Sequence, residues 1–211
     1  MTAGGDPAFD SVRTTLESAL KIPFAVTVSS SQAGDGKTQL AAGTARAFAA
    51  AGFSTIVVDA HPGYPGVGPA LGVGDLPLPP NAQSASLELA ALEILTIEPR
   101  LDAVSIASHR LLQGVKPAAL RALVNELRAT YQVTIFDTCD LFYDIADDVA
   151  VKLCAACDGV VLAVRYARNP DPEDARVVAT LEKMGARIIG SVPTSYPGPF
   201  ARAVRKLLKF S

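Results

Sequence analysis

Short apolar runs alternate with helical patterns along most of this chain. Runs that predict strands cover residues 24–28, 54–58, 103–107, 133–136, 159–164 and 187–192. Their continuous apolar character is typical of strands that are covered on both faces, as in a parallel sheet. Patterns that predict helices lie between these runs, so the alternation indicates an α/β fold with a doubly wound, mainly parallel sheet flanked by helices.

The predicted helices place apolar side chains on one face at helical spacing. Residues 8–20 predict a helix within the N-terminal segment of residues 1–22. Residues 38–51 predict an alanine-rich helix, and a further predicted helix starts at Pro117. A helical stretch precedes the strand at 159–164, and another helix covers residues 172–184. The side chains expected to face inward are Phe9, Val12, Leu16, Leu20, Leu120, Leu123, Val124, Leu127, Ile145, Val149, Leu153, Val177, Leu181 and Met184.

Two segments give less regular patterns. Glycine and proline fill residues 62–80 so densely that we expect a long loop without a regular helix. Residues 84–97 are ambiguous. Residues 199–211 predict a basic amphipathic helix, with Phe200 and Leu207 on one side and basic residues elsewhere. Such a helix can lie on a membrane or dock on a partner, but an ordinary edge helix is the interpretation that we favour.

Composition limits the class of protein. The chain has 211 residues, 49% of them apolar and 19% charged, which indicates one globular domain over residues 1–211. The net charge of −2 argues against a nucleic-acid partner. Neither a signal peptide nor an apolar stretch of membrane-spanning length is apparent, and three cysteines suit a reducing compartment, so we expect a cytoplasmic protein.

Residues 23–39 carry the strongest chemical signal, with the sequence PFAVTVSSSQAGDGKTQ. A strand, a loop of small residues and a helix follow one another, and the loop ends in the second half of the phosphate-loop pattern GxxxxGK[ST], with Ser31 at the first glycine. Backbone N–H groups of such a loop bind phosphate oxygens, the lysine reaches the outer phosphates and the hydroxyl holds Mg²⁺. The candidate nucleotide-binding residues are Ser31, Gln32, Ala33, Gly34, Asp35, Gly36, Lys37, Thr38 and Gln39. A glycine-rich turn without a ligand is the alternative.

Two other predicted strands end in an aspartate, Asp59 and Asp137. In open parallel sheets, ligands bind beyond the carboxyl ends of the strands. Carboxylate oxygens suit Mg²⁺, so we expect Thr38, Asp59 and Asp137 to form the metal site and Lys37, Asp59 and Asp137 to be the catalytic residues. The alternative is that each aspartate caps the loop that follows it.

The chain resembles a known family, the bacterial tyrosine kinases of capsule and exopolysaccharide synthesis (CpsD/CapB type). This family lies within the MinD/ParA class of P-loop ATPases. The segments that carry the resemblance are AFDSVRTTLES, SSSQAGDGKTQ, STIVVDAHPGYPGVGPALGV, YQVTIFDTCD, CDGVVLAVRYARN and GARIIGSVPT. They lie in the family's order and spacing over nearly the whole chain. The resemblance implies a P-loop fold, ATP with Mg²⁺, self-association and a membrane-embedded polysaccharide chain-length regulator as partner and activator, which would bring a cytoplasmic protein to the inner membrane.

The chain departs from the family pattern at several positions. His61 stands at the second aspartate of the motif that contains Asp59, and Gly63 stands at its arginine. The family has an N-terminal oligomerising signature of Glu, Arg and Arg, of which this chain retains only Arg13. Thr194 stands where the family has an asparagine that contacts the base. The family's C-terminal tyrosine cluster is missing. These differences predict ATP binding with weakened tyrosine phosphorylation. The alternatives are a ParA/MinD-like ATPase, which Gln32 at the signature lysine disfavours, and a non-catalytic ATP-binding regulator of polysaccharide export.

The remaining candidates are a histidine and three cysteines. We expect His61 to face solvent, with a proton shuttle beside Asp59 as the alternative. Cys154 and Cys157 form a single CxxC pair, which we expect to be two buried apolar residues and not a metal site. Cys139 follows Asp137 closely, but no catalytic base accompanies it.

Overall fold

The computed structural model describes residues 6–62, 66–78, 87–108, 112, 114–141, 149–166 and 172–194. The strands are β1 (Phe24–Ser29), β2 (Thr55–Ala60), β3 (Leu95–Glu98), β4 (Leu101–Ser105), β5 (Val133–Thr138), β6 (Gly159–Arg165) and β7 (Ile188–Thr194). The helices are α1 (Pro7–Ala19), α2 (Lys37–Ala50), α3 (Val67–Ala70), α5 (Pro117–Thr130), α6 (Val149–Ala156) and α7 (Pro172–Lys183), with a 3₁₀ turn η1 (Leu89–Ala91).

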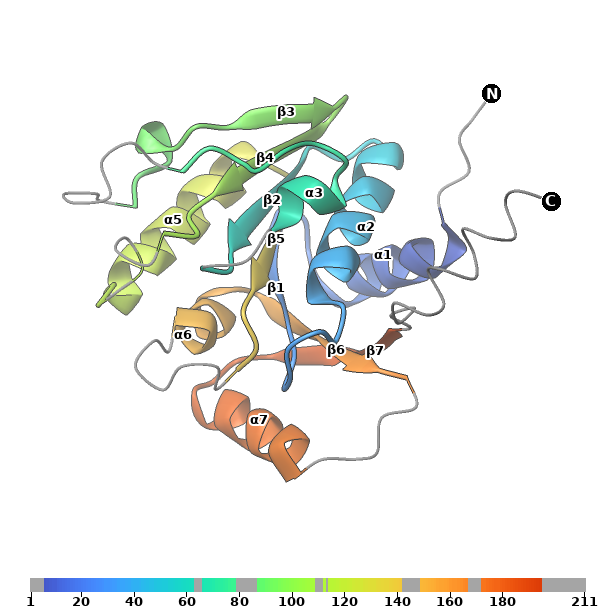
Figure 1. The fold of residues 1–211 in the computed structure, drawn as a ribbon, viewed down its shortest axis with the longest axis vertical. Helices are drawn as coiled ribbons and strands as arrows, with labels where there is room; N and C mark the ends of the chain where they lie inside the picture. The colour runs from blue at the N-terminus through green and yellow to red at the C-terminus, as the bar shows by residue number, and fades with distance from the viewer. Residues whose placement is uncertain are drawn as a thin grey trace.

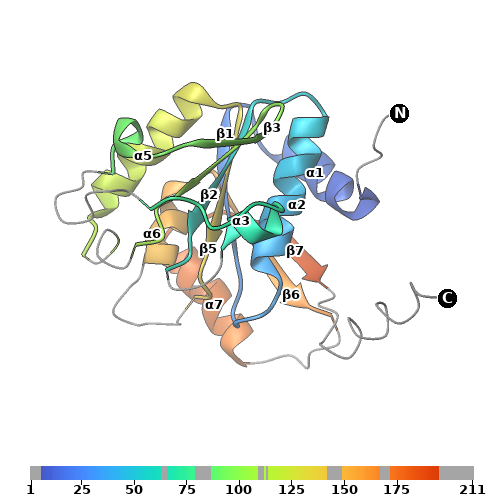
Figure 2. The same cartoon turned by 45° about the horizontal axis from the view of Figure 1, so that its top comes forward.

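Seven strands form one sheet in the order β3-β4-β2-β5-β1-β6-β7. Every neighbouring pair is parallel except β3 with β4, so the predicted doubly wound and mainly parallel sheet is confirmed. Figures 1 and 2 show α1 and α2 on one face of the sheet and α5, α6 and α7 on the other. No helix within the described ranges is both long enough and apolar enough to cross a bilayer.

The central strands are buried on both faces, as their continuous apolar sequences predict. All six residues of β1, of β2 and of β5 are buried. Val26, Val57 and Ile135 pack in the core beneath α2. Their strand neighbours Ile56 and Phe136 pack in the core beneath α5 and α6. Because side chains alternate between faces along a strand, these two cores also fix the face that each strand-end residue occupies.

Some details differ from the sequence predictions, and two predictions concern residues that the structure does not describe. The ambiguous region contains β3, a short antiparallel edge strand with mostly exposed side chains, and exposed edge strands lack a clear apolar pattern. One helical turn, α3, lies in the region predicted to have no regular helix, where Pro69 is one of its residues. Met184 is 47% exposed because α7 ends one residue earlier. Ile145 and the predicted helix over residues 199–211 lie outside the described residues.

Helix α1 packs on α2 through an aromatic ring placed over a glycine. A Cβ atom added at Gly43 would lie 2.3 Å from the Phe9 ring, so this position has room only for glycine. Leu16 and Leu20 are buried in the same core, and Phe9 and Val12 pack against it. The predicted inward face of this helix is therefore confirmed. Arg13 pairs within α1, with Asp10 at 3.4 Å and Glu17 at 2.6 Å.

Gly43→Ala tests this close approach. Alanine favours a helix over glycine by about 1 kcal/mol, but overpacking costs about 1–3 kcal/mol. We expect the substitution to lower the free energy of unfolding of the parent by about 1 kcal/mol. In a Phe9→Ala background the same substitution should instead raise it by up to about 1 kcal/mol. Chemical denaturation measures both values.

Gly190→Ala is the control, because no heavy atom lies within 4 Å of a Cβ added there. This substitution should change stability equally in both backgrounds. Gly43→Ala with the same sign of effect in both backgrounds would contradict the proposed packing.

Candidate nucleotide-binding site

Residues 30–36 form a loop between β1 and α2 at the carboxyl edge of the sheet. Gly34 and Gly36 have φ values of 78° and 85°, and Gly36 is the residue immediately before α2. This left-handed region is costly for residues that have a Cβ atom, which explains both glycines. The predicted strand, loop and helix are therefore all present, with the N-terminus of α2 directed at the loop.

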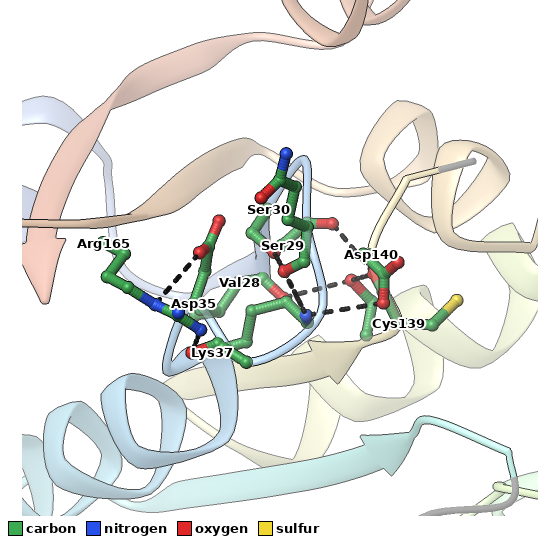
Figure 3. Close-up of polar contacts among 11 residues, drawn as sticks. Val28, Ser29, Ser30, Asp35, Lys37, Cys139, Asp140 and Arg165 are labelled. Atoms are coloured by element: carbon green, nitrogen blue, oxygen red, sulfur yellow. Dashed lines mark hydrogen bonds and ion pairs between the residues drawn. The ribbon is translucent and has the colours of Figure 1, made fainter. Parts of the chain in front are cut away.

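Residues from distant elements hold the outer side of this loop. Arg165, at the end of β6, donates a hydrogen bond of 2.8 Å from Nη2 to the Gly34 carbonyl oxygen (Figure 3). Thr194, at the end of β7, donates its hydroxyl to the Asp35 carbonyl oxygen. Ser31 donates its hydroxyl to the Asp174 carboxylate in the first turn of α7. Thr194 therefore contacts the loop itself, although in the family pattern its position corresponds to a base-contacting residue.

The side chain of Lys37 lies inside the loop and is 4% exposed. Its ammonium group donates to the Ser30 hydroxyl at 3.1 Å and to the Gln32 carbonyl oxygen at 3.4 Å. An oxygen of Asp140 lies 3.7 Å from the same ammonium group (Figure 3). Lys37 thus places a buried positive charge among loop atoms at the start of a helix, where anions are favoured.

The two predicted aspartates lie side by side at the carboxyl edge of the sheet. Asp59 in β2 is paired directly with Asp137 in β5, and Val28 of β1 is paired with Asp137 on its other side. Each aspartate is two residues beyond Val57 or Ile135, so both carboxylates belong to the face that α2 covers. The strand order therefore brings together the carboxylates that the sequence singled out.

Asp137 is fully buried, and neither of its carboxylate oxygens accepts a hydrogen bond from the described residues. The pKa of this carboxyl is raised to about 7, mainly by burial and to a smaller extent by the negative charge of Asp59. The Thr38 hydroxyl and the Lys37 ammonium lower this pKa, although the hydroxyl does not reach hydrogen-bonding geometry. A buried carboxylate without a donor, next to a threonine hydroxyl, fits the oxygen ligands that Mg²⁺ requires.

Asp59 also accepts hydrogen bonds from the backbone that follows β2. Its Oδ1 accepts a hydrogen bond of 3.1 Å from the His61 backbone N–H. The Val67 N–H also contacts the carboxylate, and a Cβ atom at Gly66 would lie 1.8 Å from its Oδ2. Asp59 therefore caps the loop that follows β2, as the structural alternative predicted. Burial raises its pKa to about 6, in spite of these two backbone donors.

His61 is half-buried, so the expectation that it faces solvent is wrong. Burial lowers its pKa, and the positive charge of Lys37 lowers it further, while the negative charge of Asp140 opposes both. The imidazole therefore lies within electrostatic range of the phosphate loop and is held toward its neutral form. Gly63, the other departure in this motif, lies outside the described residues.

Sequence reasoning missed Asp140 among the site residues. The segment YQVTIFDTCD shows it three residues after Asp137, where the family pattern YDYVIIDTPP has a second proline. A charged residue in place of that proline was the available signal. Arg165 and Asp174 gave no comparable signal, because their contacts with the loop depend on the order of the strands.

The two cysteines of the CxxC pair differ in burial: Cys154 is buried, as predicted, whereas Cys157 is half-buried. Cys154 is fully buried in α6, where its sulfur accepts a hydrogen bond of 3.3 Å from the Thr27 hydroxyl. Burial raises the pKa of the Cys154 thiol to about 12 and that of the Cys157 thiol well above its usual value. No group of three or more His, Cys, Asp or Glu side chains among the described residues could hold a metal ion.

Comparison with solved structures identifies the class of this fold. The chain shares the P-loop fold of MinD/ParA-type ATPases: MinD from Pyrococcus horikoshii OT3, solved with Mg-ADP, matches with a TM-score of 0.63 and 19% identity over 86% of this chain and 76% of that chain. Bacterial tyrosine kinase domains share it as well. The kinase domain of Escherichia coli tyrosine kinase ETK has a TM-score of 0.74 and 18% identity over 90% of this chain and 74% of that domain.

The VpsO kinase domain gives a similar match. Its TM-score is 0.71 and its identity 22%, over 90% of this chain and 94% of that chain. No protein-family model and no curated protein sequence matches the chain. At these identities the similarity establishes the fold, and the site has to be argued from the residues of this chain.

Asp137→Asn tests whether a buried charge strains this site. The folded pKa of about 7 lies above the ordinary value of 3.8, so Asp137 favours folding at low pH and this contribution is lost as the pH rises through 7. Without nucleotide or divalent cations, we expect the variant to be more stable than the parent by about 1–3 kcal/mol at pH 8. The fall in stability between pH 5 and 8 should also become shallower, which thermal unfolding at several pH values measures.

Asp102→Asn is the matched control, because the Asp102 carboxylate accepts a hydrogen bond from Tyr131 away from the loop. If the stability of Asp137→Asn depends on pH in the same way as that of the parent, Asp137 is not a buried carboxyl with a raised pKa.

Proposed function

We propose that this chain binds ATP with Mg²⁺ and is a kinase-like relative of the exopolysaccharide tyrosine kinases with weakened phosphotransfer. The observation that carries the proposal is the phosphate loop that surrounds the buried Lys37 ammonium at the same sheet edge as the unsatisfied Asp137 carboxylate. A site of this charge pattern suits a polyphosphate with a divalent cation. The fold it shares with ETK and with the Mg-ADP complex of MinD supports the same proposal.

Each part of the site has a distinct task in this proposal. The backbone N–H groups of residues 31–39 and the positive end of α2 bind phosphate oxygens. Lys37 would neutralise charge on the outer phosphates, while Thr38, Asp59 and Asp137 would hold Mg²⁺. The ion supplies further neutralisation of the phosphate charge. Arg165, Thr194 and Asp174 keep the loop in place through the contacts described above.

The motif that contains Asp59 and His61 is where catalytic strength is reduced. A carboxylate at position 61 would favour removal of a proton from an incoming tyrosine hydroxyl, whereas this chain has a half-buried histidine there. Asp59 is also occupied in part by the His61 and Val67 backbone amides. General-base assistance is worth about 10²–10⁴ in rate, so its loss leaves a site that binds ATP but transfers phosphate slowly.

The cellular setting is proposed from the resemblance. In this setting a membrane-embedded polysaccharide chain-length regulator recruits and activates a cytoplasmic chain, which self-associates. A MinD-like ATPase is the second candidate, because MinD shares this fold. Labelled ATP separates the possibilities: label on protein tyrosine supports the kinase, free phosphate supports the ATPase, and binding without turnover supports a non-catalytic regulator.

Lys37→Ala tests the nucleotide site. Charge-assisted hydrogen bonds contribute about 1.5–3 kcal/mol, so we expect ATP affinity to fall by about 10–100-fold in calorimetry. Lys183→Ala is the matched control, because Lys183 is exposed at the opposite end of α7 from the Asp174 contact. Unchanged ATP affinity in Lys37→Ala would refute the assignment.

His61→Asp combined with Gly63→Arg tests the loss of catalytic strength. The parent should bind ATP with little or no tyrosine autophosphorylation. The double variant should phosphorylate faster, because it has a carboxylate and a cation in the motif that contains Asp59, as the family pattern does. Incorporation of labelled phosphate into protein measures the rate. Robust autophosphorylation by the parent, or a double variant that is slower than the parent, would disprove this explanation.

A further inference from the structure

Asp140 is a buried carboxylate that contacts the phosphate-binding lysine. It is 8% exposed, and its Oδ1 lies 3.7 Å from the Lys37 ammonium (Figure 3). The same Oδ1 accepts no hydrogen bond from the described residues. The Lys37 ammonium offsets part of the cost of burying this charge, since removing a carboxylate from water is costly unless a cation lies nearby.

The segment around Asp140 is fixed against the start of the phosphate loop. The Leu141 N–H donates to the Ser30 carbonyl oxygen at 2.9 Å, and the Ser29 hydroxyl donates to the Cys139 carbonyl oxygen at 3.1 Å. The Thr138 hydroxyl donates to the Val28 carbonyl oxygen at 3.1 Å. These bonds flank Asp140 on both sides and hold its backbone against the start of the phosphate loop.

The ammonium group of Lys37 has three N–H donors, and two of them have partners in the loop. The Ser30 hydroxyl and the Gln32 carbonyl oxygen accept from it, while Asp140 lies on its remaining side. A phosphate oxygen that approaches Lys37 has to share or replace the interaction with this carboxylate. Two anions close to one ammonium group also repel each other strongly in a buried site.

We propose that Asp140 sets the nucleotide affinity of this site, because its carboxylate competes with the outer phosphates of the nucleotide for Lys37. The inference rests on the proposed nucleotide site and identifies a residue that limits it. Only ligands whose outer phosphates reach Lys37 encounter the competition. The penalty therefore falls on nucleoside triphosphates and leaves a nucleoside monophosphate nearly unaffected.

The experiment compares the parent with Asp140→Asn and Asp140→Ala by calorimetry, using Mg-ATP and AMP on the full chain. Both substitutions remove the competing charge, and together they guard against a fault in folding of one variant. We expect ATP to bind about tenfold more tightly to each variant, while AMP affinity changes less than twofold. Asp102→Asn removes one negative charge elsewhere and should leave both affinities unchanged. Circular dichroism and thermal unfolding verify that each protein is folded.

The outcomes separate the two proposals. If ATP binds the parent in a Lys37-dependent manner but Asp140→Asn binds it equally or more weakly, the competition is disproved and the nucleotide site stands. An equal gain for AMP and ATP would also overturn it, because general repulsion would then replace competition at Lys37. If neither the parent nor the Asp140 variants bind ATP, the nucleotide site fails and this inference fails with it.

Discussion

The parallel pairing of β1 with β5 is the constraint on which the candidate site depends. These strands are separated by more than one hundred residues in the sequence, yet Val28 is paired directly with Asp137. The pairing places the phosphate loop, which follows β1, beside the segment that follows β5. Thr138, Cys139 and Leu141 then bond to Val28, Ser29 and Ser30, so the contact extends beyond the sheet into the loop.

The charges gathered by this pairing explain why the site suits a phosphate ligand and a divalent cation. The negative charge of Asp59 adds to the effect of burial in raising the pKa of Asp137, and the positive charge of Lys37 offsets part of this rise. Asp137 has no hydrogen-bond donor among the described residues. A protein tolerates such a buried, incompletely compensated group where function requires it, because a ligand or ion can supply what the fold does not.

The same arrangement shows how a shared fold differs from a shared activity. The fold is shared with tyrosine kinase domains and with MinD. The side chains that would activate a hydroxyl or contact a base differ, since His61 is half-buried and Thr194 is bonded to the loop. A shared fold does not fix a shared activity, which depends on the side chains at the site.

The buried strands, most of the helices, the phosphate loop and the two aspartates at strand ends could all be predicted from the amino-acid sequence. Each of these follows from local patterns: continuous apolar runs, helical spacing in α1 and α5, and a glycine-rich turn that ends in Lys37 and Thr38. Local patterns failed at β3 and Met184, where an exposed edge and a helix end leave little apolar periodicity.

The side chains that surround the loop could not be predicted in this way, because distant segments supply them. Arg165 reaches Gly34 across 131 residues of sequence, and Thr194 reaches Asp35 across 159. Asp140 opposes Lys37 because β5 lies next to β1 in the sheet, and His61 is drawn inward because Asp59 binds the backbone after β2. These contacts depend on strand order and on the packing of distant segments, which no local pattern of apolar and polar residues encodes.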